Sequence, residues 1–424
     1  VTGTDTNGCS STASHTLTVY PLPVVTISGP TNVCTGGSVT LTASGAKRYL
    51  WSPGGQTTAS ITVTNSGTGS GNSLVSSVVG TNVTGVVQNS ATSALAFTTT
   101  ANTYTSGLTI KSGTVSGAVA NSFGANANVI TIGDSAGSAN ATLSGAGAVT
   151  FANPISVAIG NTGVAKITDT ANSTFSGAVT LNSHDLTLAP AANNLVLSGG
   201  VSGTGNLTIG TTGVGTTTLS TVSVNNAGTI TNNGTGAGLT TISGGVGSNV
   251  TAVTESSTTS ALTISTNALT VNGGGTTLTN SNASGSALLT VSGGITGTGN
   301  VVLNNNSAIA NGVTVSGTSV NNVGTVTNSG TGTGATAISA VIGTNVTGVV
   351  ENSATSTLTL SMSAVNDAPT DGNETATVTE DTTLTVNAAS GLLAAISAAY
   401  WRLVFPRANS ISPRRSSSTS IQAW

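Results

Sequence analysis

Carboxylate and amine side chains, the groups that could transfer protons or cleave glycosidic bonds, are scarce in the long central part of this chain. Residues 65–362 hold seven of them: Asp134, Asp169, Asp185, Glu255, Glu351, Lys111 and Lys166. A polysaccharide-cleaving site needs two carboxylates, or a carboxylate and a base, a few ångströms apart. Most of the seven stand alone, and we interpret Lys166 and Asp169 as a surface pair. We therefore predict that the chain is not an enzyme.

Repetition is the strongest pattern in the sequence. Gly80–Ser93 (GTNVTGVVQNSATS) and Gly343–Ser356 (GTNVTGVVENSATS) match at 13 of 14 positions across 263 residues. A looser copy, Gly247–Ser260, lies 96 residues before the second, and the same interval links Ser223–Gly238 to Ser319–Gly334. The one mismatch places Gln88 opposite Glu351, so this position tolerates loss of charge and is a poor candidate for catalysis.

The 96-residue interval divides into four units of about 24 residues, the size of one coil of a parallel β-solenoid. Only 4% of the residues are charged, and Val, Ile, Leu and Thr recur in short segments separated by Asn-Gly turn signals. Stacked coils place like residues over like residues, and equal charges in such a column repel. We predict an all-β chain with a parallel β-solenoid over residues 65–362.

The first 64 residues have a different composition, with four of the nine prolines and both cysteines, Cys9 and Cys34. The segments Val33–Gly45 and Tyr49–Gly55 (YLWSPGG) resemble immunoglobulin-like or PKD-like modules of bacterial surface proteins. The resemblance implies a β-sandwich module over residues 24–64, truncated because its closing strands and its second cysteine are missing. Residues 1–23 resemble the end of a preceding module, which leaves the pairing of Cys9 with Cys34 open.

Two segments of the repeat array resemble the passenger-associated β-strand repeat of autotransporters. They are Asn102–Gly117 (NTYTSGLTIKSGTVSG) and Gly203–Ile209 (GTGNLTI). The resemblance implies a right-handed β-helix that serves as a stalk on a bacterial surface or in a secreted protein.

Residues 363–394 resemble the start of a cadherin-like or VCBS-type module of bacterial adhesins, through Ala364–Thr370 (AVNDAPT) and Ala376–Leu393. In such linkers hard oxygen ligands hold calcium. The resemblance therefore implies a Ca²⁺ site with four oxygen-bearing side chains: Asn366, Asp367, Glu380 and Asp381. The alternative is a solvated acidic turn.

Residues 395–424 carry four of the eight basic residues. We interpret this segment as an unstructured basic tail unrelated to the array, with a membrane- or polyanion-binding tail as the alternative. Elsewhere Lys and Arg are too few for nucleic-acid binding, and no apolar run reaches the ~20 residues of a membrane span.

These patterns predict a non-enzymatic structural or adhesion protein of the bacterial cell surface or extracellular space. Its Thr-, Ser- and Asn-rich faces would contact glycans or neighbouring cells through many weak interactions. Three alternatives remain: a self-assembling surface-layer or filament protein, an ice-binding solenoid with rows of Thr, and a polysaccharide-cleaving enzyme. We expect the Thr spacing to be too irregular from coil to coil for ice binding, so we do not prefer that alternative.

Overall fold

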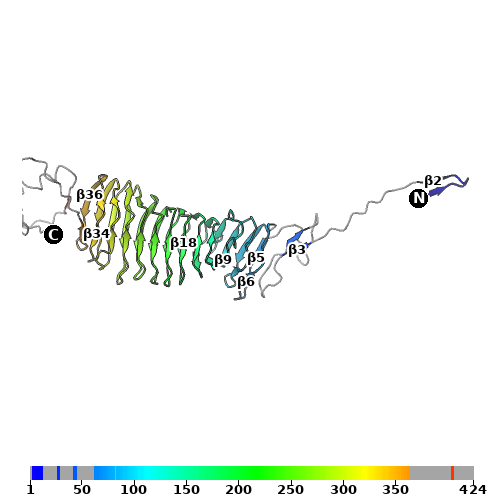
Figure 1. Cartoon of the computed structure of the whole chain (residues 1–424), viewed down its shortest axis with the longest axis horizontal. Helices are drawn as coiled ribbons and strands as arrows, with labels where there is room; N and C mark the ends of the chain where they lie inside the picture. Colours follow the sequence, from blue (N-terminus) through cyan, green and yellow to red (C-terminus); the bar gives the residue numbers. More distant parts are fainter. Residues whose placement is uncertain are drawn as a thin grey trace, which may run out of the picture.

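Residues 62–361, apart from residue 82, form a parallel β-solenoid in the computed structural model of the protein (Figure 1). The structure describes residues 2–12, 26–28, 42–44, 62–81, 83–361 and 403–404. These residues contain strands and no helix, and the strands of the solenoid stack into about 13 coils. The predicted parallel β-solenoid is confirmed.

Each regular coil contributes one strand to each of three parallel sheets, which we call the first, second and third faces. The first face contains β5 (Thr62–Asn65), β7 (Gly85–Asn89), the start of β9 (Leu108–Gly117), β10 (Ile130–Ile132), β13 (Ile155–Val157), β16 (Val179–Asn182), β19 (Val201–Thr204), β26 (Leu269–Val271), β29 (Ile295–Gly297), β32 (Ser319–Val320) and β35 (Val341–Ile342). Isolated bridges through Val224 and Val246 continue this face between β19 and β26.

The second face includes the C-terminal half of β9, a ten-residue strand that pairs with both β10 and β11 and so joins two faces without a loop. Its strands are β6 (Ser73–Val75), β8 (Leu95–Phe97), β11 (Ala141–Gly145), β14 (Ala165–Asp169), β17 (Leu186–Leu188), β20 (Leu207–Ile209), β22 (Gly228–Asn232), β24 (Val250–Glu255), β27 (Thr276–Asn280), β30 (Val301–Asn305), β33 (Gly324–Asn328), β36 (Val346–Glu351) and β38 (Leu403–Val404).

The third face is a separate ten-stranded parallel sheet. Its strands are β12 (Thr150–Phe151), β15 (Ser173–Phe175), β18 (Leu195–Leu197), β21 (Thr217–Leu219), β23 (Thr240–Ile242), β25 (Leu262–Ile264), β28 (Leu289–Val291), β31 (Val313–Val315), β34 (Thr336–Ile338) and β37 (Leu358–Leu360).

The spacing of 96 residues corresponds to four coils. On the third face, Thr241, Thr263, Thr290, Thr314 and Ala337 are consecutive in-register partners, and Thr241 and Ala337 are 96 residues apart. The steps along this column vary between 22 and 27 residues, and the strands stay in register because the loops absorb the difference.

The core is a narrow column of apolar side chains inside the solenoid. Three-residue strands bury their first and third residues and turn the middle one outward, as the two-residue period of a β-strand requires. Leu186 and Leu207 stack in register with Ile230 on the second face, and all three are fully buried. Each coil buries little apolar area alone, so its stability depends on its neighbours.

Aromatic residues gather in the N-terminal coils. The rings of Phe123, Phe151 and Phe175 stack with centroids 4.9 Å and 5.1 Å apart, and Phe97 meets Phe123 edge to face. Phe151 and Phe175 lie in register on β12 and β15 of the third face, and Phe123 extends their stack into the preceding coil.

Two short antiparallel pairs precede the solenoid. β1 (Thr2–Thr4) pairs with β2 (Ser10–Thr12), and β3 (Thr26–Ser28) pairs with β4 (Thr42–Ser44). Most of the predicted immunoglobulin-like module of residues 24–64 lies outside the described residues, so that interpretation stays a prediction. Cys9 is exposed and free, and Cys34 is not among the described residues.

Glycine at the corners allows adjacent coils to approach closely. A Cβ atom on Gly238 would overlap the carbonyl oxygen of Gly215 in the preceding coil. We expect Gly238→Ala to lower the free energy of unfolding by about 2 kcal/mol, the typical cost of overpacking. Gly273→Ala is the matched control, because a Cβ there has no neighbouring atom within 4 Å. Equal denaturant midpoints for the two variants would contradict this account of the corners.

Candidate functional site

A buried polar cluster lies at the corner between the second and third faces. Asn232 ends β22, and Glu255 lies directly above it at the end of β24, in the next coil. The Asn232 side-chain amide donates hydrogen bonds to Glu255 Oε2 at 2.7 Å and to the Ser260 carbonyl oxygen at 2.5 Å. Both side chains are fully buried. The amide therefore links two successive coils inside the solenoid.

Two serines complete the cluster from the loop that follows Glu255. Ser257 Oγ donates to the Gly234 carbonyl oxygen in the coil below, and Ser260 Oγ donates to that of Gly238. Ser257 Oγ also accepts the Ser260 main-chain N–H at 2.8 Å. We call this set of one Asn, one Glu or Gln and two Ser the polar corner.

The polar corner occurs three times and explains the long-range sequence repeat. Asn65 donates to Gln88 at 2.8 Å in the first copy, and Asn328 donates to both oxygens of Glu351 at 3.0 Å in the last. The paired serines bond the preceding coil in each copy; they are Ser90 and Ser93 in the first and Ser353 and Ser356 in the last. The motif E/Q-x-S-x-x-S repeats because all its polar members contact the coil below.

The same sequence serves at two different corners of the solenoid. Gln88 lies on β7, which pairs with β9, and β9 pairs with β10 on the first face. The next strand, β8, belongs to the second face, so the first copy turns the chain from the first face to the second. Glu351 lies on β36 of the second face, and its copy turns the chain to the third. The polar corner is therefore a transferable turn unit that is not tied to one face.

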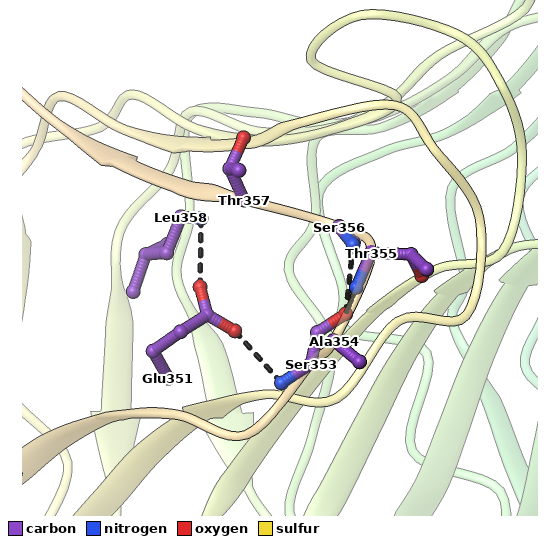
Figure 2. Close-up of a pocket in the computed structure, with 7 residues that line it drawn as sticks. All are labelled: Glu351, Ser353, Ala354, Thr355, Ser356, Thr357 and Leu358. Carbon is purple, nitrogen blue, oxygen red and sulfur yellow. Dashed lines mark hydrogen bonds between the residues drawn. The ribbon is translucent and has the colours of Figure 1, made fainter. Parts of the chain in front are cut away.

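Figure 2 shows the last copy from inside the corner. The Glu351 carboxylate accepts the main-chain N–H of Ser353 and that of Leu358, each at 2.8 Å. A hollow lined by Glu351 and residues 353–358 opens here. At the equivalent place in the interior, Asn280 of the next coil lies in register over Glu255, and both side chains are fully buried.

The electrostatics of the interior favour uncharged groups. Burial raises the pKa of Glu255 from its ordinary value of 4.5 to about 8, against the opposing effect of hydrogen bonds from Asn232, Ser257 and Leu262. Gln88 is the neutral counterpart: its oxygen accepts from the Asn65 amide, and its own amide donates to the carbonyl oxygens of Ser90 and Ser93 instead of accepting main-chain N–H groups. The corner is thus satisfied by either side chain.

Asp169 corrects one expectation from the sequence. It is 3% exposed and faces the interior, whereas Lys166 faces outward on the same strand. Their odd spacing along β14 places them on opposite sides, so the predicted surface pair is wrong. Neither carboxylate oxygen bonds another residue, and burial raises the pKa of Asp169 to about 6.

An ion pair forms between other residues. Lys111 and Asp134, on adjacent coils, approach to 3.3 Å at the surface. Asp169, Glu255 and Glu351 occupy inward positions of three separate coils, on β14, β24 and β36. Sequence spacing alone did not reveal that these acids face inward, although each ends a β-strand at an inward position.

The predicted calcium ligands Asn366, Asp367, Glu380 and Asp381 all lie outside the described residues, so the calcium site stays a prediction. Within the described part of the chain, no three His, Cys, Asp or Glu side chains gather in a way that could hold a metal ion. That part also contains no helix able to cross a membrane.

The third face presents two columns of small hydroxyl side chains. One outward position of each strand is in register along the whole face. It is occupied by Thr in eight of the ten strands, by Val196 in β18 and by Ala337 in β34. The Thr column contains Thr150, Thr174, Thr218, Thr241, Thr263, Thr290, Thr314 and Thr359. Two residues further along each strand, from β15 to β37, stands a serine. These are Ser176, Ser198, Ser220, Ser243, Ser265, Ser292, Ser316, Ser339 and Ser361.

Comparisons with known proteins give no match of any kind: no family model, no curated protein and no solved structure resembles the chain. Any functional conclusion therefore depends on the geometry.

The amide of Asn232 should be required for coil stacking. Asn232→Ala leaves the Ser260 carbonyl without its donor and removes one bond to Glu255, so we expect a loss of about 2–3 kcal/mol in the free energy of unfolding. The neighbouring Asn233 is exposed, and Asn233→Ala should change stability by less than about 0.5 kcal/mol. Urea unfolding of both variants tests this, and a neutral Asn232→Ala would remove the polar corner from the account.

Glu255 should make stability depend on pH. The folded chain retains the Glu255 proton up to about pH 8, whereas an unfolded glutamate releases it near 4.5. The contribution of this group to the free energy of unfolding is therefore complete below pH 4.5, and it decreases as the pH rises from 4.5 to 8. Glu255→Gln removes this dependence and should be more stable than the parent by about 2 kcal/mol or more at pH 8.

The comparison isolates Glu255 because Asp169 is present in both proteins. The measurement is the difference between their thermal midpoints at several pH values. A difference that stays constant from pH 4.5 to pH 8 would show that Glu255 titrates normally in the folded chain.

Proposed function

We propose that this chain is a non-enzymatic, extracellular structural and adhesion protein whose solenoid acts as a stalk and display surface. The observation that supports this most directly is the repetition of small, uncharged hydroxyl side chains at fixed outward positions of successive coils. Such a surface offers many equivalent weak contacts along one rod, and multivalent attachment gains strength from their number.

The composition of the interior supports the same role. Small aliphatic columns, corner glycines and polar corners are all used to stack coils. The carboxylates of Glu255 and Glu351 bond main-chain and amide N–H groups, as structural groups do. A bacterial cell surface or the extracellular space is the location that we propose, with glycans or neighbouring cells as partners.

The test uses beads coated with the full chain at controlled density. We expect the beads to adhere to glycan-coated surfaces or bacterial cells more strongly as density rises, while the soluble chain binds the same glycans only weakly. The glycans should be recovered intact. Tight one-to-one binding by the soluble chain, or cleavage of the glycan, would contradict the proposal.

A further inference from the structure

The third face combines regular spacing with fixed side-chain positions. Its ten strands pair in register from β12 to β37. Neighbouring parallel strands lie about 4.8 Å apart, and residues two apart along a strand are separated by about 6.6 Å. The Thr and Ser columns therefore form a two-dimensional hydroxyl array, with one row per coil.

The Ser column is held by the main chain as firmly as the Thr column. The N–H of each serine donates to a carbonyl of the preceding coil, so that the sheet ladder extends one residue beyond each strand. The donors are Ser176, Ser198, Ser220, Ser243, Ser265, Ser292, Ser316, Ser339 and Ser361, with distances between 2.7 Å and 3.0 Å. Both columns are consequently rigid positions on the sheet.

The hydroxyls of the Thr column are free to bind an external partner. In the described part of the chain, seven of the eight make no hydrogen bond to protein, and only Thr314 bonds a nearby carbonyl. The two Ser of each polar corner, by contrast, all bond the preceding coil, as Ser260 does to Gly238. The side chains of Thr263 and its neighbours in the column are half-buried, so part of each one is accessible to solvent.

The chemistry of the face excludes most classes of ligand. Its ten strands and the Ser column contain no charged residue, so a charged partner has no counter-charge here. The only aromatic rings, Phe151 and Phe175, are buried in the core, so sugar rings have no exposed platform to stack on. A sheet surface with short, uncharged side chains at regular spacing suits an extended, uncharged, periodic solid.

The geometry points to an ice-binding face formed by the Thr and Ser columns of β15 to β37. Threonine presents a methyl and a hydroxyl at each lattice point, and together these can hold water molecules in an ice-like arrangement. The row spacing set by strand stacking is close to the repeat of water molecules along an ice crystal surface. This inference rests on the proposed display function and names ordered water as what one face binds.

The regularity is not visible along the sequence, because the threonines are separated by unequal numbers of residues. Thr241 and Thr263 are 22 residues apart, and Thr263 and Thr290 are 27 apart, yet each pair is directly in register. The extra residues lie in the loops between strands and leave the strands of the third face in register. The irregular spacing that disfavours ice binding at the sequence level thus disappears in the fold.

The experiment measures thermal hysteresis and partition into a slowly growing ice front with the full chain. The disrupted variant is Thr263→Lys with Thr290→Lys, which places two long charged side chains in the middle of the third face. The matched control is Thr208→Lys with Thr231→Lys on the second face. Its column natively contains Lys166, two positions from Thr208, so lysine is compatible with the fold there.

We expect the parent and the control to enter ice and to show hysteresis, and the disrupted variant to lose most of both. Equal melting curves of the three proteins verify that folding is intact. Absence of hysteresis and ice partition in the parent would overturn the inference, as would equal activity of the two variants.

Two further results would overturn it in favour of another occupant. The first is pull-down of the parent by crystalline cellulose or chitin without any ice partition. The second is a parent dimer in sedimentation that dissociates in the Thr263→Lys, Thr290→Lys variant. Bead adhesion to glycans that persists in all three proteins would leave the display function standing while ice binding fails.

Discussion

The structure depends on one constraint: each coil must lie at hydrogen-bonding distance over the next, with like positions in register. Any side chain that points inward therefore meets its own counterpart above and below. Charged or bulky groups in such a column would repel or collide, which accounts for a composition with 4% charged and 3% aromatic residues. Leu, Ile and Val occupy the columns, and glycine occupies corners such as Gly238, where one main chain lies against another.

The polar corner satisfies this constraint with hydrogen bonds in place of apolar contact. An amide such as Asn232 can donate to the coil above and accept from its own coil, so Asn alternates well with Glu or Gln in one column. Asn280 and Asn305 continue the column beyond Glu255 by donating to main-chain carbonyls. A Glu side chain is accommodated there because main-chain and amide N–H groups donate to it; these bonds lower its pKa, but burial outweighs them and raises the pKa of Glu255 to about 8.

The sequence predicted the solenoid because repetition and low charge follow directly from stacking. The spacing of 96 residues gave the number of coils between copies, and pairing from Thr241 to Ala337 confirms it. The sequence did not predict which way individual polar residues face. Lys166 and Asp169 looked like a surface pair. Only the strand assignment shows that both lie on β14, where a spacing of three places their side chains on opposite sides. The sequence also did not predict the Thr column, because the loops between strands vary in length although the strands stay in register.

Residue-resolved amide hydrogen exchange over residues 62–361 tests the stacking most directly. The account predicts slow exchange that is continuous from coil to coil on all three faces, including the main-chain N–H groups of Ile230, Val253 and Leu278, which lie over one another. Protection should weaken only toward the last coil, where Glu351 is partly open to solvent. Fast exchange in the central coils, or protection confined to isolated segments, would contradict a single column of in-register coils.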